Sequence, residues 1–231
     1  MSQFIQQFFD TRERAAIALA DAIAAQLDAA ITARGQATLV ASGGSSPLAA
    51  FRALSARDID WSKVTVLPSD ERWVPETHSA SNGGMLDREL RRNAAAKAKR
   101  VSLFAEGLDG AEAVAAIDAR LKALPRPFDV VLLGMGGDGH TASLFPDDPD
   151  IEAQLTSRDD VVFARPPSQD VARLSLTPRA LLDAQHIALL FFGEDKAQVF
   201  ALASAGGELA ELPVRVVLRQ QIVPVTTYHA R

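Results

Sequence analysis

The sequence predicts an α/β fold, a Rossmann-like, mainly parallel sheet flanked by helices with a small additional strand excursion. Along most of the 231 residues, short apolar segments alternate with segments of helical periodicity, and this alternation is typical of a parallel sheet covered by helices. The segment "FDVVLLG" at 128–134 has no polar alternation after Asp129, as expected for a strand buried on both faces. The length fits one domain, residues 1–231.

The first half of the chain supplies clear element signals. Residues 11–35 are rich in Ala and Leu at helical spacing and end at Gly35, which predicts a helix with a glycine C-cap. A buried strand is predicted at 37–41, and Ser46 and Pro47 are expected as the N-cap and first residue of the next helix. The elements expected after them are a strand at 64–68, a helix from about 84, a strand at 100–104, a helix at 109–124 and a strand at 128–134.

The second half interrupts this rhythm once. The segment "VVFARPPSQDVARLSLTP" predicts strands joined by an excursion, which an antiparallel pairing would accommodate. The helix "TPRALLDA", the strand "HIALLFFG", the helix "EDKAQVFALASA" and a last strand "VPVTTYH" are expected to follow. His186 is expected to open a strand, whereas His78 and His229 are expected in a loop and in the tail.

Composition excludes several classes of function. The net charge of −5 argues against a nucleic-acid binder, which would need a basic stripe. The absence of cysteine excludes disulfides, thiolate metal sites and a cysteine nucleophile. The start "MSQFIQQFFD" lacks the pattern of a signal peptide, and we expect no apolar stretch of the roughly 18 residues that a membrane span requires. We therefore expect a soluble, cytoplasmic protein without a nucleic-acid or membrane partner.

Candidate site residues follow the predicted strands, because ligands of open α/β sheets bind outside the carboxyl ends of the strands. The first such loop is "SGGSSP", which contains Ser42, Gly43, Gly44, Ser45 and Ser46. Its glycines allow close backbone approach, and the following helix start favours an anion. This loop is either a phosphate cradle or a tight turn with a capping serine.

Charged residues follow two further strands. In "SDERWVP", Asp70, Glu71 and Arg72 are either part of a solvated charge run or groups that contact a ligand, since an Arg beside a Trp can present a fork of donors. In "LLGMGGDGHTASLFP", the glycines let the chain turn sharply and present Asp138 and His140 at the sheet edge. His140 is either a loop histidine without a role or a base whose tautomer a carboxylate fixes, since an unperturbed imidazole titrates near pH 6.5.

Two more cations lie near the ends of predicted elements. Arg173 begins "RLSLT", and Lys196 lies in the first turn of the helix "EDKAQVF". A lysine in a first turn opposes the helix dipole, which makes sense if an anion binds beside it. The alternative is that Arg173 and Lys196 are ordinary surface residues, as most Arg and Lys are.

These motifs together resemble the 6-phosphogluconolactonases. "SGGSSP", "SDERWVP", "SN" at 81–82, "LGMGGDGHTASLFP", "RLSLT" and "GEDKAQVF" occur in the order found in that family, between about residues 35 and 200. The larger group is similar in fold to the glucosamine-6-phosphate deaminases. The resemblance implies hydrolysis of 6-phospho-D-glucono-1,5-lactone to 6-phosphogluconate in the oxidative pentose phosphate pathway, with no metal and no organic cofactor.

The resemblance also implies roles for individual residues. His140 would be the general base for the attacking water and would return the proton to the ring oxygen. Arg72 would lie near the sugar or the developing oxyanion, with Asp70 and Asp138 lining the site. The phosphate would be held by the loop at 42–46, Arg173 and Lys196. The partner implied is a small phosphorylated lactone, and we expect a monomer.

Two departures bear on the alternatives. In the similar deaminases an Asn-Glu follows the Asp-Gly-His core and supplies an extra acid, whereas this chain carries Phe145 in place of that glutamate, which disfavours a deaminase/isomerase. The chain also ends "VPVTTYHAR", without the aspartate that often follows the last strand of similar lactonases.

Two other classes of function are disfavoured. A non-catalytic sugar-phosphate sensor would need an output module, and a purely structural protein would have no use for three glycine-rich loops at strand ends.

Overall fold

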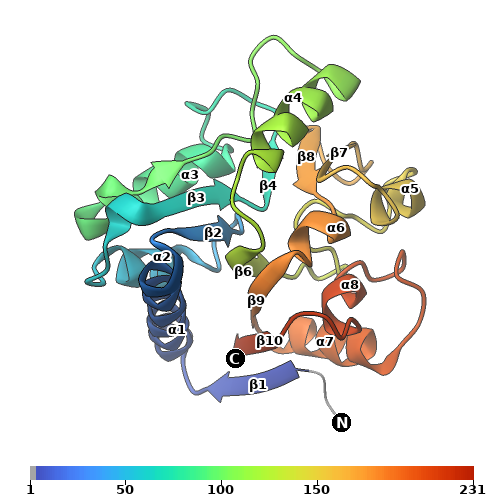
Figure 1. Ribbon diagram of the computed structural model, residues 1–231. Coiled ribbons are helices and arrows are strands. Elements are labelled where there is room, and N and C mark those ends of the chain that lie inside the picture. Colours follow the sequence, from blue (N-terminus) through green and yellow to red (C-terminus); the bar gives the residue numbers. More distant parts are fainter. Residues whose placement is uncertain (1–3) are drawn as a thin grey trace.

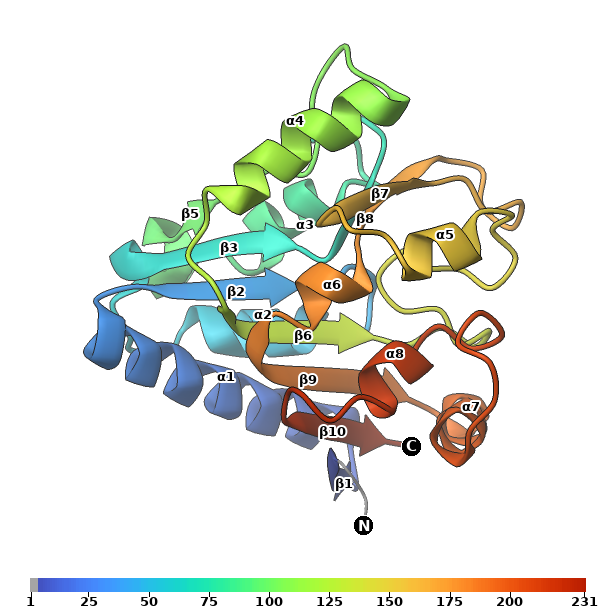
Figure 2. The same cartoon turned by 45° about the vertical axis from the view of Figure 1, so that its right-hand side comes forward.

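The computed structural model describes residues 4–231. These residues form a seven-stranded sheet in the order β1-β10-β9-β6-β2-β3-β5 and a three-stranded sheet in the order β4-β8-β7. Each strand pairing within the large sheet is parallel, and those of the small sheet are antiparallel. Figures 1 and 2 show helices on both faces of the large sheet and the small sheet beyond the end of β3. The predicted fold class and the predicted excursion are confirmed.

The element bounds follow the expected alternation along the chain. The strands are β1 (Phe4–Phe9), β2 (Ala37–Ala41), β3 (Val64–Pro68), β4 (Asp70–Arg72), β5 (Lys99–Arg100), β6 (Phe128–Gly134), β7 (Val161–Ala164), β8 (Arg173–Leu176), β9 (Ala184–Phe192) and β10 (Val225–Ala230). The helices are α1 (Arg12–Arg34), α2 (Leu48–Ser55), η1 (Trp61–Lys63), α3 (Asn82–Glu89), η2 (Asn93–Lys97), α4 (Gly110–Lys122), α5 (Ile151–Leu155), α6 (Pro178–Leu181), α7 (Glu194–Ala205) and α8 (Arg215–Leu218).

Strand β6 shows why its sequence lacks polar alternation. Val130 and Leu132 face a core shared with α1 and α2, whereas Val131 and Leu133 face a second core shared with α4, α6 and α8. Because successive side chains of a strand point to opposite faces, a sheet covered on both sides needs apolar residues at both positions. The two helical layers therefore bury the sheet interior and leave its carboxyl edge for the loops.

Helix α1 ends as the sequence predicts. Thr11 accepts a hydrogen bond from the backbone N–H of Arg14 at its start, and Gly35 closes it in a left-handed conformation with φ of 74°. By length and composition alone the helix is long and apolar enough to cross a membrane, with a mean hydropathy of 1.5, so our expectation that no such stretch exists is wrong. Half of that apolar window is buried against the protein itself, which accounts for its hydropathy.

Some elements differ from the prediction. Ser46 does not cap α2, which begins at Leu48 without a side-chain cap. A turn precedes the helix, in which the Leu48 N–H donates to the Ser45 carbonyl, and Ser46 lines a pocket instead. Helix α3 begins before Gly84, since Ser81 caps it at Asn82. The strand expected at 100–104 shortens to β5, whereas β1, β4, α5 and α8 have no counterpart in the prediction.

The C-terminal tail forms a buried strand. Strand β10 pairs in parallel with both β1 and β9, and all six of its residues are buried. His229 therefore lies inside the sheet rather than in a tail. Its ring stacks on Phe191 at 4.8 Å and meets the edge of Phe8 at 5.3 Å, and neither ring nitrogen has a hydrogen-bond partner within residues 4–231.

Buried His229 should make the protein less stable in mild acid. Burial lowers the pKa of His229, whereas the same residue in the unfolded chain takes up a proton near pH 6.5. Below that pH the unfolded state binds more protons than the folded state, so the free energy of unfolding falls as pH falls. His186, whose pKa burial also lowers, acts in the same direction.

Thermal unfolding of wild type and His229→Phe between pH 8 and pH 5 measures this effect. We expect a smaller loss of melting temperature on acidification in the variant. The substitution His78→Gln, at an exposed histidine, serves as the control and should leave the wild-type pH dependence intact. Equal pH dependence in wild type and His229→Phe would show that His229 does not carry the effect.

Candidate active site

The carboxyl ends of β2, β3, β6 and β9 meet at one edge of the large sheet (Figure 2). The segments that leave these ends, together with Arg173 at the start of β8, surround a cavity of about 230 Å³. Its walls include these predicted site residues: Ser42, Gly43, Gly44, Ser45, Ser46, Asp70, Arg72, His140, Arg173 and Lys196. Of the predicted set, Asp138 alone is not on the wall; it contacts His140, which is.

Asp138 binds both the ring and the backbone of His140. Asp138 Oδ1 lies 2.6 Å from His140 Nδ1 and 3.1 Å from the His140 backbone nitrogen, whose N–H it accepts. Burial would raise the pKa of Asp138, but its hydrogen bonds and charge interaction with His140 outweigh burial and lower the pKa. An ionised Asp138 fixes the proton of the imidazole on Nδ1 and leaves Nε2 as the nitrogen that is free to accept a proton.

Glycine at position 136 makes this pair possible. A Cβ built on Gly136 would collide with His140 Nδ1 and with Asp138 Oδ1. The backbone N–H of Gly136 also donates to the His140 carbonyl at 2.9 Å, which closes the loop on itself. The glycine-rich sequence after β6 therefore serves close packing of the Asp–His pair against backbone, and any side chain at 136 would displace it.

The ring of Phe145 stacks against the imidazole of His140. The two rings stack with centroids 4.2 Å apart at an interplanar angle of 26°, and Phe145 is buried. The Arg173 guanidinium lies over the same ring at 5.3 Å. Phe145 thus presents one apolar ring to both the imidazole of His140 and the guanidinium of Arg173.

Two arginines face the cavity as neighbours across the small sheet. Arg72 of β4 pairs in register with Arg173 of β8. Like charges directly opposite one another destabilise an antiparallel pair, and here Asp70 offsets them in part, with its Oδ2 3.8 Å from Arg173 Nη1. Burial lowers the pKa of Arg173, and the charge of Arg72 adds to the shift while Asp70 opposes it. An anionic or oxygen-rich ligand in the cavity would stabilise both cations.

Asp70 anchors three segments around the site. Its Oδ1 accepts from Ser69 Oγ at 2.9 Å, and its Oδ2 accepts from Ser143 Oγ at 2.6 Å. Because these bonds and Arg173 occupy both carboxylate oxygens, Asp70 lines the cavity as a fixed group that holds the end of β3, the loop after His140 and the small sheet together.

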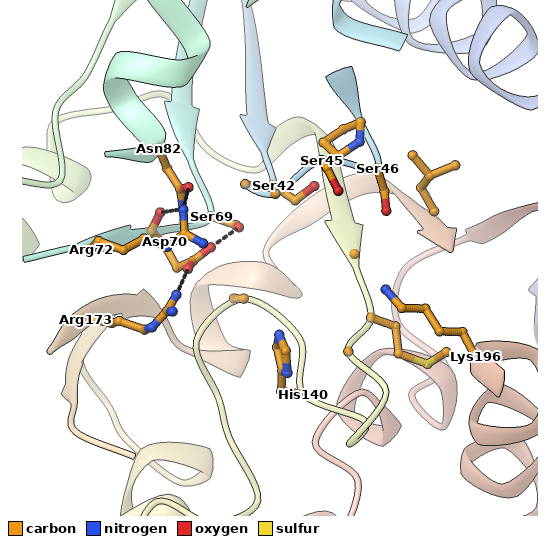
Figure 3. Close-up of a pocket in the computed structure, with 18 residues that line it drawn as sticks. Ser42, Ser45, Ser46, Ser69, Asp70, Arg72, Asn82, His140, Arg173 and Lys196 are labelled. Atoms are coloured by element: carbon orange, nitrogen blue, oxygen red, sulfur yellow. Dashed lines mark hydrogen bonds and ion pairs between the residues drawn. The ribbon is translucent and has the colours of Figure 1, made fainter. Parts of the chain in front are cut away.

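Asn82 belongs to the site although the prediction does not include it. Its Oδ1 accepts from Arg72 Nη1 at 2.5 Å, and its Nδ2 donates to the Asp70 carbonyl at 2.7 Å (Figure 3). Its amide also fills the space where a Cβ on Gly43 would lie. The "SN" pair at 81–82 was the only sequence signal for it, and the role of Asn82 becomes clear once α3 is placed beside β4.

The buried carboxylate of Glu71 holds the start of α3 against β4. Its Oε1 accepts from the backbone N–H groups of Arg72 and Asn82 at 2.8 and 2.7 Å. Its Oε2 accepts from Ser81 Oγ at 3.0 Å and from the N–H of Gly83 at 2.7 Å. Burial raises the pKa of Glu71 although these bonds oppose the shift. Four donors on one side chain fix the start of α3, and hence Asn82, relative to β4.

The substitution Glu71→Gln should lower the free energy of unfolding by about 1–3 kcal/mol. A glutamine amide would place donor hydrogens where the carboxylate accepts the Gly83 N–H and would leave that buried group unpaired. The midpoint of urea unfolding measures the effect, and Glu106→Gln, at an exposed loop position, is the control. A Glu71→Gln protein as stable as its control would contradict an anchoring role for the carboxylate.

The opposite wall of the cavity carries hydroxyls and a lysine. Figure 3 shows Ser45, Ser46 and Lys196 together on the side away from Arg173. Ser42 Oγ is buried and has no hydrogen-bond partner in the described chain. Burial lowers the pKa of Lys196, and the nearby charge of Asp138 opposes the shift. These unpaired donors provide a site for an anionic group at this end.

The chain is similar to known proteins over nearly its whole length. The family described as glucosamine-6-phosphate isomerases/6-phosphogluconolactonase matches residues 10–226. A protein of Rhizobium meliloti (strain 1021) named 6-phosphogluconolactonase is 44% identical over 225 residues, which are 96% of this chain and 97% of the relative. A protein of the same name from Pseudomonas putida is 45% identical over 222 residues, 94% of this chain and 90% of the relative.

The fold is also similar to that of solved structures. The crystal structure of a 6-phosphogluconolactonase from Shewanella baltica OS155 superposes with a TM-score of 0.96 at 38% identity and covers 99% of this chain and 98% of its own. The family match spans the loop at 42–47, the DER segment, the Asp–His pair and Lys196. On these grounds the chain belongs to the family of glucosamine-6-phosphate isomerases and 6-phosphogluconolactonases.

Proposed function

We propose that this protein hydrolyses 6-phospho-D-glucono-1,5-lactone to 6-phospho-D-gluconate in the oxidative pentose phosphate pathway. The relatives at 44–45% identity carry the name of that activity. The observation that carries the mechanism is His140, bonded to Asp138, on the wall of a cavity that Arg72, Arg173 and Lys196 also line. We further propose that residues 1–231 act as one lactonase domain, as a cytoplasmic monomer.

His140 is the general base in this proposal. With Nδ1 bonded to Asp138, Nε2 takes a proton from water as the water oxygen attacks the lactone carbonyl carbon. The tetrahedral adduct then expels the ring oxygen, and the imidazolium returns its proton to that oxygen. One C–O bond forms and one breaks, and the imidazole is regenerated. The lactone is already reactive, so a positioned base and oxyanion donors suffice for the chemistry.

The other residues of the cavity would bind the sugar, the oxyanion and the 6-phosphate. Arg72, held by Asn82, would face the sugar or the oxyanion that develops on the carbonyl oxygen. Lys196 and the hydroxyls of the loop at 42–46 would hold the 6-phosphate from one wall, and Arg173, which lies beside Arg72 on the other wall, would contact it from across the cavity. Binding energy from the phosphate, remote from the carbonyl, would orient the ring toward His140.

Phe145 opposes the deaminase alternative. An aldose–ketose isomerisation with loss of amine needs a further proton transfer beside the base. The side chain at that position stacks flat on His140 and has no ionisable group. The same ring is compatible with lactone hydrolysis, which needs no second acid there.

A direct assay tests the proposed function. The lactone is generated in situ from glucose 6-phosphate and its spontaneous hydrolysis is subtracted, and glucosamine 6-phosphate is supplied separately as the substrate for ammonia release. We expect fast lactone hydrolysis and no ammonia. A lactone rate equal to the spontaneous rate would refute the proposal, and ammonia release would favour the deaminase.

A further inference from the structure

A second cavity adjoins the candidate active site on its lysine side. Its volume is about 460 Å³, and it shares Ser45, Ser46 and Lys196 with the first cavity. Its remaining walls are Arg12, Glu13, Ala49 and Phe192. The end of the site proposed for the phosphate is therefore open toward the start of α1, where Arg12 lies.

Arg12 has no acidic side chain as a partner in the described residues. Its guanidinium lies 5.4 Å from the centroid of the Phe192 ring, and its Nε donates at 3.4 Å to an oxygen of the carboxyl group of Arg231, the last residue of the sequence. Across residues 4–231, neither Arg12 nor Lys196 forms an ion pair with an Asp or Glu side chain, although Glu13 lines the same cavity. Arg12 is instead held by an aromatic face and by one long contact with Arg231.

The placement of these two cations is unfavourable without a ligand. Arg12 lies in the first turn of α1 and Lys196 in the first turn of α7, where the positive end of the helix dipole disfavours a cation. They also act on each other, since the charge of Arg12 contributes to lowering the pKa of Lys196. A dianion near Ser45 and Ser46 would stabilise both cations at once.

We propose that Arg12 is a specificity-determining residue that selects the phosphorylated lactone over the unphosphorylated one. It forms an outer cation beside Lys196 at the phosphate end and attracts the phosphate dianion from the adjoining cavity. This inference rests on the proposed function, because it assigns Arg12 to the substrate of that site. Glu13, of opposite charge on the same wall, should act in the opposite direction.

Kinetics of Arg12→Gln test the proposal. We expect KM for 6-phospho-D-glucono-1,5-lactone to rise about 3- to 10-fold, as for a charge near the surface, with kcat unchanged and KM for unphosphorylated glucono-1,5-lactone unchanged. The increase should shrink as ionic strength rises. The matched control is Arg14→Gln, two residues along α1, where the arginine is exposed and pairs with Asp10. Arg12→Lys should restore KM and Glu13→Gln should lower it.

Binding of the product separates this inference from the proposed function. Calorimetric titration with 6-phospho-D-gluconate needs no turnover, so weaker binding by Arg12→Gln than by Arg14→Gln supports the role of Arg12 even if lactone hydrolysis fails. Equal KM and equal product affinity in these two variants would overturn it. A rise of KM in Glu13→Gln like that in Arg12→Gln would also overturn it, because opposite charges cannot act alike through electrostatics.

Discussion

Replacement of His140 by alanine should lower kcat for lactone hydrolysis by about 10²–10⁴-fold, the usual contribution of a positioned general base. KM should stay close to the wild-type value, because the groups proposed to hold the phosphate lie on other segments. The reaction is followed as lactone disappearance after subtraction of the spontaneous rate, which sets the lowest rate that can be measured. The large effect is expected because His140 is the histidine on the cavity wall.

Packing must be separated from proton transfer in this test. His140 stacks on Phe145, so the alanine variant also removes a ring contact. The variant His140→Phe keeps a ring of similar shape without a proton acceptor and should be as inactive as His140→Ala. Either variant retaining kcat within tenfold of wild type would exclude His140 as the base.

Asp138→Asn provides the intermediate case. The amide keeps the size of the side chain but replaces the charge that faces His140 Nδ1 at 2.6 Å. We expect a smaller loss of kcat than in His140→Ala, since Asp138 is partly exposed to solvent and acts by orienting the imidazole. The split between kcat and KM distinguishes this positioning role from a structural one, because kcat alone should fall when the groups proposed to hold the phosphate lie on other segments.

The parts of the fold that local pattern controls could be predicted from the sequence. Helix α1 carries its own caps at Thr11 and Gly35, and β6 carries an uninterrupted apolar run. The parallel arrangement follows from their alternation, because a helix between two strands returns the chain to the same edge. These elements need no information about distant residues, and their predicted bounds agree with the structure within a residue or two.

Elements that depend on distant partners could not be predicted. Strand β1 exposes Ile5 and Phe8, so its sequence has no two-sided apolar pattern, and it exists because β10 lies beside it. Strand β4 has three residues and is ordered by pairing with β8, about a hundred residues later in the chain. Tertiary pairing rather than local propensity determines both strands.

The same division applies to the site. The rule that ligands bind at the carboxyl edge of a parallel sheet brought ten of the eleven predicted residues to one cavity wall. The roles of Glu71 and Asn82 could not be predicted, because their partners come from α3 and β4, which touch only in the folded protein. The role proposed for Arg12 could not be predicted either, since Arg12 and Lys196 line one cavity only in the folded protein.

Replacement of Lys196 by methionine should raise KM for the phosphorylated lactone by about 10²-fold, the loss expected when one member of a desolvated charge pair is removed. Methionine keeps the unbranched stem and removes the charge. Because Lys196 has no carboxylate partner among the described residues, the substitution leaves no protein charge unpaired, so the effect reports on the substrate. We expect kcat within a few-fold of wild type and KM for unphosphorylated glucono-1,5-lactone unchanged.

A control and a pH series complete this test. Lys97→Met, at an exposed lysine of η2, should behave as wild type, and Lys196→Arg should recover most of the affinity. Because burial lowers the pKa of Lys196, its ammonium loses its proton at a lower pH than an ordinary lysine does. Wild-type affinity for 6-phospho-D-gluconate should therefore fall on the alkaline side earlier than that of Lys196→Arg, whose guanidinium stays protonated. If Lys196→Met binds product as well as Lys97→Met does, the phosphate lies elsewhere in the cavity, and Arg173 with Arg72 becomes the pair to test.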